Sequence, residues 1–499
     1  MSQKPRPPMI LADDFLQRNK IAWRMEPGKK DPNNPILSPR YPWDLGAVFS
    51  HGTALLDPID GLYKMWYLST PKEKGLYRQL TYAYSEDGVK WVRPMVGVYP
   101  FGKHKRTNIV LGTKMGGIVS QVSVFIHPDA EPDRRYEMFC YRDPIHHPAA
   151  SGPYSNPSKR IEGVPLPPGL NHNCYGLYRH FSPDGIRWRV EGEPVAGGPQ
   201  TRDAYGGRPF VSSDGLSVFQ LRDGRYVIHN KVQLPAIPGG YVKYDVGAGE
   251  CRTIARRESP DGREWGHTYE NILTPDWRDP QDTQFMELMM NEYNDGFIGV
   301  ATVYHCVEGT IDLQFIGSRD GKKWIRPVRR PCVSLEPLGD VDGGMLWPMR
   351  GFVIDGEKVH LYYAGLTGLH GDVYSNVPVC DGAFEGAMCR ATWELGRMWG
   401  MTHFSGNDEE ASVTTRPVQW QGKTLFINAV TRGSGKVEAE LLDYEFKPLR
   451  GYTRKECRAV RGDSKCARLG WRTGPKPKLE APLLRIILTD ARLYGFEWR

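Results

Sequence analysis

The sequence predicts an all-β protein in which a five-bladed β-propeller is followed by a C-terminal β-sandwich. A seven-residue box, S-x-D-G-x-x-W, occurs four times, at residues 85–91, 182–188, 259–265 and 318–324. Repetition of one supersecondary unit is typical of propellers and other repeat architectures. The composition agrees, because 55 Gly, 40 Pro and 11% aromatic residues suit short strands joined by tight corners.

Each copy of the box follows the same succession of predicted strands. Before the first box, residues 52–69 read as two strands joined by a D-G turn, and residues 78–84 read as a third strand. A fifth unit covers residues 351–365 and 386–394 with the same layout but ends without the box. Five such units predict five four-stranded blades over residues 35–400.

The box itself is predicted to be structural. Its Gly supplies a positive φ at the turn, and its Asp and Ser can bond the backbone groups of that turn. Its Trp begins the outer strand and packs back under the turn. We therefore assign the box no catalytic role.

The two ends of the chain differ from the repeats. Residues 401–499 lack the box and contain strands with period-two alternation, which predicts a β-sandwich accessory domain. Residues 1–34 are expected to pack on the propeller or to close its last blade. The predicted organisation is therefore an N-terminal extension (1–34), a propeller catalytic domain (35–400) and a sandwich (401–499).

Charge and composition narrow the class of function. The net charge is +7 and the pI about 8.8, with Lys and Arg scattered, which is typical of a mixed surface and compatible with an acidic glycan. No basic arm or zinc-finger spacing is present, so we do not expect nucleic-acid binding. The sequence contains no apolar run of about 18 residues, so we expect no membrane span. It also shows no apolar h-region, so we expect no secretory signal. A cytoplasmic location is expected unless a signal peptide has been removed, and homo-oligomerisation is left open.

Propeller geometry predicts where a ligand site lies. If the strands of a blade are lettered A to D from the axis outwards, the boxes lie at C–D corners on one face. The B–C loops and the connections into each strand A lie on the other face, which we call the loop face. The first strands converge there on a central depression, and such depressions are the usual ligand sites.

Ionisable and aromatic residues are concentrated in the segments predicted on the loop face. The candidate catalytic carboxylates are Asp44, Asp203, Asp282, Glu287 and Asp342. The candidate substrate-binding residues are Trp43, His51, Asp143, Arg208, His305, Trp347, Arg350 and His370. Aromatic faces pack on the C–H groups of a sugar ring, and carboxylates handle its hydroxyls and protons. The set therefore indicates a carbohydrate ligand.

Glu287 is the most informative of these residues, because it lies in an apolar predicted strand, FMELMM, close to the axis. Burial would raise its pKa and suit it to general-acid catalysis. The alternatives are a Glu on the polar side of a strand and a structural pair with Arg350. Asp282 and Asp342 precede first strands, where a base or nucleophile would stand, although each could equally cap a turn.

These repeats and strands resemble a known superfamily. The four boxes, the strands GLYKMWYLS and KVHLYYAG, and the YRDP at 141–144 are similar to the five-bladed β-propeller glycoside hydrolases of families 32, 43, 68, 117 and 130. The C-terminal LRIILTDARLYGFEW resembles the sandwich of family 32-like proteins, and residues 312–327 and 339–353 resemble uncharacterised bacterial members of that group. The resemblance implies carboxylates from separate blades acting as base or nucleophile, acid and modulator.

The chain departs from the fructosidases of family 32 at their catalytic motifs. The place of their W-x-N-D-P-N nucleophile motif reads YPWDLGAVFSHG here, and the E-C pairs Glu250–Cys251 and Glu456–Cys457 are not on first strands. Fructan hydrolysis is therefore not expected. The RDP segment follows the second strand of its blade, so the resemblance transfers no catalytic role to Asp143.

The leading hypothesis is a glycoside hydrolase that cleaves from the end of an oligo- or polysaccharide. Glu287 would protonate the leaving oxygen, and Asp282 or Asp342 would activate water or attack the anomeric carbon. A carboxyl separation of about 6.5–9.5 Å would indicate inversion, and about 5–5.5 Å retention. No cofactor is required, and a structural Ca²⁺ in the central channel is compatible with the scaffold.

Three alternatives remain open. A glycoside phosphorylase on the same scaffold would need a cluster of Arg, Lys and His at the depression to hold phosphate, and Arg202, Arg208 and Arg350 are candidates for it. A non-catalytic carbohydrate-binding protein would bind ligand without turnover. A lyase would use His51 or His370 with a Tyr to abstract a proton next to a uronate.

Overall fold

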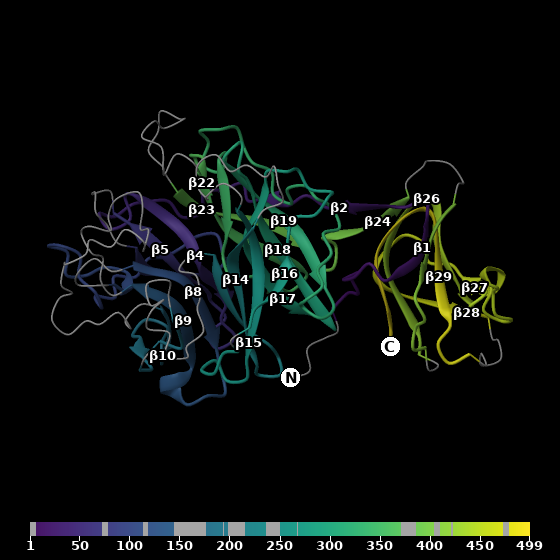
Figure 1. Cartoon of the computed structure of the whole chain (residues 1–499), viewed down its shortest axis with the longest axis horizontal. Coiled ribbons are helices and arrows are strands. Elements are labelled where there is room, and N and C mark those ends of the chain that lie inside the picture. Colours follow the sequence, from purple (N-terminus) through teal and green to yellow (C-terminus); the bar gives the residue numbers. More distant parts are fainter. Residues whose placement is uncertain are drawn as a thin grey trace.

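The protein is all-β, and its strands form two groups (Figure 1). The structure, a computed structural model, describes residues 6–71, 78–112, 118–143, 176–192, 194–197, 215–235, 250–266, 268–370, 386–403, 410–420, 423–472 and 479–499. Within these ranges the regular structure is strands β1 to β29 and the 3-10 turns η1 (Pro132–Arg134) and η7 (Arg454–Glu456). None of the described helices is long and apolar enough to cross a bilayer.

The first repeat forms a four-stranded antiparallel sheet. Its strands, in order, are β4 (Ala47–Leu56), β5 (Tyr63–Thr70), β6 (Gln79–Ser85) and β7 (Ile109–Leu111). The predicted D-G corner between β4 and β5 is confirmed, since Gly61 has φ +75° and its N–H donates to the Asp57 carbonyl. Strand β5 is buried along nearly its whole length, because neighbouring sheets cover both of its faces.

The next repeats follow the same antiparallel order. The second sheet contains β8 (Ile118–Ile126), β9 (Tyr136–Asp143), β10 (Gly176–Ser182), β11 (Arg189–Val190) and β12 (Ala196–Gly197). The third contains β13 (Leu216–Gln220), β14 (Tyr226–Pro235), β15 (Glu250–Ser259) and β16 (Glu270–Leu273). The fourth contains β17 (Thr283–Tyr293), β18 (Gly296–His305) and β19 (Thr310–Ser318). Each repeat therefore begins with the hairpin that the sequence predicts.

The fifth unit ends on a strand from the other end of the chain. It contains β20 (Met345–Pro348), β21 (Val353–Asp355), β22 (Lys358–Leu366), β23 (Gly386–Glu394) and β3 (Lys29–Lys30). The outermost strand, β3, pairs with Ala391 and Thr392 of β23. One parallel pair, Ile311 with Met345, joins this unit to the fourth sheet.

The four boxes are turns with the same hydrogen bonds. In the first, Ser85 Oγ accepts the Gly88 N–H at 2.9 Å, and Asp87 Oδ1 accepts the N–H groups of Val89 and Lys90 at 2.8 Å each. The box glycines have φ between +69° and +77°. These contacts recur in the other three boxes, so the prediction of a structural role is confirmed.

Each of the last three boxes also contacts the sheet of the repeat before it. The box tryptophans lie against the second strand of that sheet, in the pairs Trp188–Trp66, Trp265–Phe139 and Trp324–His229, with ring centroids 6.2–6.4 Å apart. The first box makes the same contact with the fifth unit, because Trp91 lies edge-on to Tyr362 at 5.7 Å. The repeats thus contact one another in succession, and the first contacts the last.

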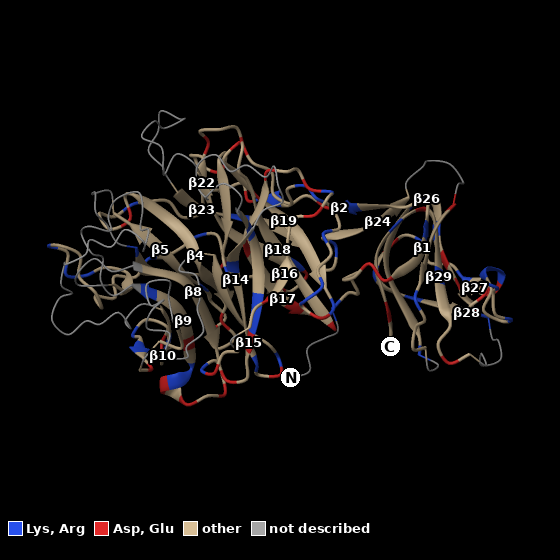
Figure 2. Cartoon of the chain, viewed as in Figure 1, with Lys and Arg blue, Asp and Glu red and all other residues tan. Residues whose placement is uncertain are grey.

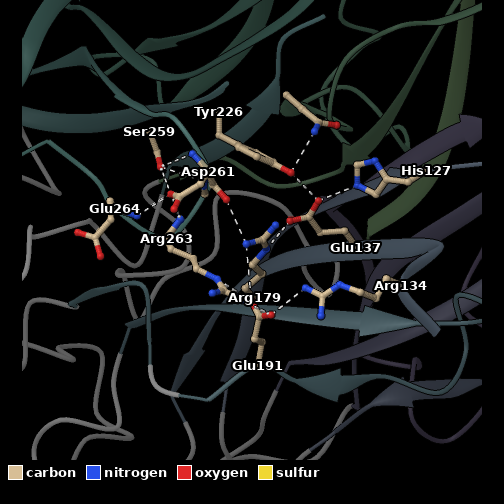
Figure 3. A network of polar contacts seen from close by, with 12 residues as sticks. His127, Arg134, Glu137, Arg179, Glu191, Tyr226, Ser259, Asp261, Arg263 and Glu264 are labelled. Atoms are coloured by element: carbon tan, nitrogen blue, oxygen red, sulfur yellow. Dashed lines mark hydrogen bonds and ion pairs between the residues drawn. The ribbon is translucent and has the colours of Figure 1, made fainter. Parts of the chain in front are cut away.

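A buried polar network links the second and third sheets (Figure 3). The Glu137 carboxylate accepts hydrogen bonds from Arg179 Nε at 2.5 Å and from the Tyr226 hydroxyl at 2.8 Å, and it lies 2.7 Å from His127 Nε2. Arg179 also donates to the Asp261 carbonyl in the third box. The Glu137 side chain is fully buried, so these partners replace its hydration.

The C-terminal part is one eight-stranded antiparallel sheet around its own apolar core. Its strands are β1 (Phe15–Asn19), β2 (Ala22–Met25), β24 (Trp399–His403), β25 (Glu410–Thr415), β26 (Leu425–Leu442), β27 (Cys457–Arg458), β28 (Asp463–Trp471) and β29 (Leu483–Trp498). Two of them, β1 and β2, come from the N-terminus and pair with β25 and β24. The N-terminal extension therefore joins both groups of strands rather than packing on the repeats alone.

Charged residues of both signs are spread over both groups of strands (Figure 2). Many of them form exposed pairs, such as Arg189 with Asp133 and Lys447 with Glu445. Exposed pairs of this kind contribute little to stability. The charged residues are thus scattered over the described part of the folded chain, as they are in the sequence.

Candidate active site

Three first strands share a local irregularity that turns polar side chains inwards. Strand β4 has a register shift between Phe49 and Thr53, and β8 has one between Ser120 and Ser123. The residues inside these two bulges, His51 and Gln121, have φ of +46° and +56°. A third shift, in β17, immediately precedes Glu287. Bulges re-aim side chains, and positive φ in residues other than Gly is uncommon and is concentrated at functional sites.

The structure brings Glu287, His51 and Arg350 together. The Glu287 residue is 1% exposed, and its Oε1 lies 3.3 Å from His51 Nε2 and 4.0 Å from Arg350 Nη1. These three residues come from β17, from β4 and from the segment after β20. The cluster therefore places a carboxyl group, an imidazole and a guanidinium where first strands of different sheets meet.

Arg350 is held by four acceptors from other repeats. Its Nη2 donates to Gln121 Oε1 at 2.6 Å, its Nη1 contacts Ser217 Oγ and Met289 Sδ, and its Nε lies 3.4 Å from the Val122 carbonyl. Burial lowers the pKa of Arg350 to about 10, and the Glu287 carboxyl opposes that shift. The guanidinium still carries its charge at neutral pH, since that pKa lies well above 7.

Aromatic rings line the cluster on the side of the fifth unit. Trp347 lies edge-on to His51, with centroids 5.2 Å apart, and is stacked on His370 at 6.4 Å. His370 in turn lies 4.6 Å from the Tyr304 ring. Such an arrangement offers apolar faces beside polar groups, which is the combination that a sugar ring needs.

A second polar group lies at the loop-face ends of β17, β18 and β19. His305 Nε2 lies 2.6 Å from Asp312 Oδ2, and this hydrogen bond raises the pKa of His305. Asp282 lies beside them, where its Oδ2 accepts the Val307 N–H at 3.4 Å. Arg252 Nη1 donates to Gln284 Oε1, and its guanidinium lies over the Tyr304 ring. Arg252 therefore connects this polar group with the aromatic rings beside His370.

Asp282 immediately precedes β17 and lies far from Glu287 along the chain of that strand. Five residue steps of a β-strand span about 16 Å, which is longer than the carboxyl separations that glycosidases use. The bulge after Phe285 shortens this distance only slightly. Asp282 would therefore have to lean a long way along the strand to act with Glu287.

Asp342, Asp44 and Trp43 each make a different set of contacts. Asp342 Oδ2 lies 2.8 Å from Lys30 Nζ and accepts the Tyr363 hydroxyl at 2.9 Å. Asp44 accepts the N–H groups of Arg40 and Tyr41 and pairs with Arg93, while burial raises its pKa. The Trp43 indole donates to Asn108 and is stacked on Tyr41. These contacts describe turn and packing positions within the first and fifth units.

Several predicted residues cannot be placed. Asp203, Arg208 and Arg202 lie outside the described residues. Asp143 is described only through its backbone, which pairs with Ile118 of β8. The loop face is therefore described through its strands and through parts of its loops.

A cavity of about 180 Å³ lies beside Arg350, along the later halves of the first strands. Its polar lining includes Thr53, Ser123, Gln220 and Asn291. Among the residues that the structure describes, no group of three or more His, Cys, Asp or Glu side chains could hold a metal ion. The buried guanidinium would also repel a cation here, so these residues do not fit the structural Ca²⁺ that the scaffold allows.

Sequence reasoning overlooked Gln121, Tyr304 and Arg252. A signal for Gln121 was present, because S-Q-V-S at 120–123 matches S-H-G-T at 50–53 in polarity, and both interrupt apolar first strands. The bulges and positive φ values that make the two segments equivalent are not visible in the sequence. Tyr304 and Arg252 carried no signal, since both lie in regular strands.

No family model matches this sequence, and no curated protein is similar to it. Among solved structures, a glycoside hydrolase is similar over 74% of this chain and 92% of its own, with 10% identity and a TM-score of 0.46. A glycosyl hydrolase from Bacteroides ovatus matches over 79% and 98%, with 14% identity and a TM-score of 0.44. An N-acetylgalactosamine deacetylase from F. plautii matches over 76% and 96%, with 15% identity and a TM-score of 0.45. The function therefore has to be inferred from this chain's own residues.

Proposed function

We propose that the five sheets are the blades of one five-bladed propeller and that the C-terminal sheet folds into an accessory sandwich. The contact of Trp91 in the first box with Tyr362 of β22 supports a closed ring, because the other boxes make the same contact with the preceding sheet. The pairing of β3 with β23 supports an outer strand supplied by the N-terminus. In this arrangement β4, β8, β13, β17 and β20 surround the axis.

We propose that the protein is a glycoside hydrolase whose general acid is Glu287. The observation that carries this proposal is the buried Glu287 carboxyl group, 3.3 Å from His51 Nε2, at the meeting point of first strands from different sheets. A carboxylic acid in such surroundings can protonate a glycosidic oxygen. Trp347 and His370 supply the aromatic side of the depression, where the terminal sugar of a glycan would stack.

The second carboxylate is proposed to be Asp203. Asp342 and Asp44 are committed to Lys30 and to Arg93, and Asp282 lies about 16 Å along the strand from Glu287. In the sequence, Asp203 precedes β13, the first strand of the third sheet. It would activate water or attack the anomeric carbon, and a depression open at one face favours cleavage at a chain end.

The engagement of Arg350 favours hydrolysis over phosphorolysis. Its guanidinium nitrogens donate to Gln121, Ser217 and Val122, so they are directed at protein acceptors rather than at a phosphate in the depression. No cofactor is needed for this chemistry. The proposed partner is a carbohydrate, and the net charge of +7 makes acidic glycans part of the test.

The test is a chromatographic screen of the full chain against neutral and acidic glycans, with and without phosphate. We expect release of a monosaccharide without phosphate, and a loss of about 10²–10⁴-fold in kcat for Glu287→Gln. Glu292→Gln is the matched control, because Glu292 lies on the same strand but its carboxylate binds Arg222. Asp203→Asn should also lose activity. Asp342→Asn is the comparison, because the proposal assigns Asp342 no catalytic role.

Two results would overturn this proposal. Turnover that depends on phosphate would make the enzyme a phosphorylase. Binding of a glycan without release of any sugar, in a folded protein, would make it a carbohydrate-binding protein.

A further inference from the structure

The side-chain amide of Gln121 has only one orientation that satisfies its neighbours. Its Oε1 lies 3.0 Å from the Leu216 backbone nitrogen and 2.6 Å from Arg350 Nη2. Both neighbours are donors, so the atom between them has to be the amide oxygen. The Gln121 nitrogen therefore faces the other way, towards His51.

This orientation determines the tautomer of His51. Gln121 Nε2 lies 3.1 Å from His51 Nδ1 and can only donate to it. A ring nitrogen that accepts a hydrogen bond carries no proton, so the proton of the neutral imidazole is on Nε2. That nitrogen lies 3.3 Å from Glu287 Oε1.

The hydrogen bonds thus run in one direction, from Arg350 and Leu216 to Gln121 and from Gln121 to His51, whose Nε2 faces Glu287 Oε1 at 3.3 Å. Glu287 Oε1 faces this protonated nitrogen at 3.3 Å, outside hydrogen-bond geometry, so a proton on Oε1 would meet the N–H and Oε2 is the favoured position for the proton of a protonated Glu287. A neutral imidazole cannot take up that proton while Gln121 occupies Nδ1 and Nε2 is already protonated. The charged and titratable groups near His51 that the structure describes include Glu287 of β17, Arg350 at 4.0 Å from that carboxylate, and His370, which is stacked on the Trp347 ring that His51 meets edge-on.

We propose that Gln121 is a positioning residue that holds His51 as the Nε2–H tautomer, so that Glu287 keeps its proton on Oε2 for transfer to the leaving oxygen. This inference rests on the proposed hydrolase for its catalytic consequence. The tautomer of His51, which is the structural part of the inference, can be measured without any substrate. The bulge and positive φ at Gln121 then have a reason, since they turn its amide towards the axis.

The first test is NMR of the full chain labelled with ¹⁵N-histidine, with the His51 signals assigned by their loss in His51→Gln. In the wild type at pH 7 we expect an unprotonated Nδ1 and a protonated Nε2. Gln121→Glu replaces the donor by an acceptor next to Arg350, so both ring nitrogens should be protonated at that pH. Gln121→Met should give a mixture of neutral tautomers. A wild-type His51 with its proton on Nδ1, or with two protons, would overturn the proposal.

The second test is the pH dependence of sugar release. Gln121→Glu should place an imidazolium beside Glu287, which favours the ionised carboxylate, and the alkaline limb of the kcat profile should move to lower pH by about one unit or more. KM should change less than kcat, because Gln121 is fully buried and so is not available to contact a substrate. An unchanged profile together with an altered tautomer would overturn the catalytic part of the proposal. Absence of sugar release from every variant would reject the proposed hydrolase and leave the NMR result to decide the tautomer.

A control separates these effects from a simple change of charge. Gln17→Glu makes the same substitution at an exposed position of β1 in the C-terminal sheet. It should leave the His51 signals and the pH profile unchanged. Circular dichroism of each variant confirms that the variant is folded.

Discussion

The contact between the first box and the fifth unit predicts a large difference between two glycine substitutions. Gly88 and Gly61 have nearly the same φ, +70° and +75°. An alanine pays about 1–2 kcal/mol for this left-handed conformation at either place. At Gly61 a new Cβ meets no atom within 4 Å, whereas at Gly88 it would overlap the Tyr362 hydroxyl and lie 3.0 Å from the Tyr63 ring.

The magnitude at Gly88 follows from these neighbours. The Tyr362 hydroxyl donates to the Gly88 carbonyl at 2.9 Å, and loss of such a bond costs about 1 kcal/mol. Overpacking of a buried contact adds about 1–3 kcal/mol. We therefore expect Gly88→Ala to lower the free energy of unfolding by about 3–6 kcal/mol and Gly61→Ala by about 1–2 kcal/mol.

The assay is urea unfolding followed by tryptophan fluorescence, on both variants and on Gly88→Ala combined with Tyr362→Phe. Removal of the hydroxyl takes away the nearest overlapping atom, so the double variant should lose about 1–2 kcal/mol less than the sum of the single ones. Equal losses for Gly88→Ala and Gly61→Ala, or strict additivity with Tyr362→Phe, would refute the reasoning. Either result would mean that the first and fifth sheets do not touch here in solution.

Three further predictions concern other parts of the molecule. Glu137→Gln removes the charge that Arg179 pairs with in the buried network, and it should cost about 3–5 kcal/mol in urea unfolding, whereas Asp133→Asn in an exposed pair should cost less than about 1 kcal/mol. The hydrogen bond to Asp312 raises the pKa of His305, so the stability that this pair contributes should be fully present below about pH 6.5 and be lost as the pH rises through the raised pKa. The difference in Tm between wild type and His305→Gln, measured from pH 5.5 to 9, should therefore shrink with rising pH. A difference that grows with pH would contradict this prediction. Cys466 is exposed while burial raises the pKa of Cys140 to about 12, so peptide mapping after brief alkylation of the folded protein should find Cys466 labelled and Cys140 unlabelled.

The sequence predicts the local features of the fold well, because they depend on neighbouring residues. The box Ser, Asp and Gly bond only the turn that contains them, so the pattern at 85–91 specifies the turn at 85–91. The D-G corner before Leu62 and the buried strand after it follow from turn chemistry and from an apolar run. Glu287 could be singled out because a carboxylate within FMELMM is costly to bury without a purpose.

Contacts between distant residues had no such signal. The pairing of β1 with the C-terminal sheet joins residues 400 positions apart, as in Phe15 with Thr415. The sequence of a short exposed strand does not indicate with which sheet edge the strand will pair. For the same reason the sequence did not reveal that Asp342 pairs with Lys30.

The sequence by itself thus determined that this chain is all-β, that it is built from repeats closed by a structural turn, and that a carboxyl group lies within an apolar first strand. Only the tertiary structure decided that His51, Gln121 and Arg350 meet Glu287. Their meeting depends on two residues with positive φ and on bulges in separate strands, and neither is encoded in a local pattern of residue types. A site assembled from several sheets is a property of how those sheets pack, because the contacts that orient each side chain come from other repeats.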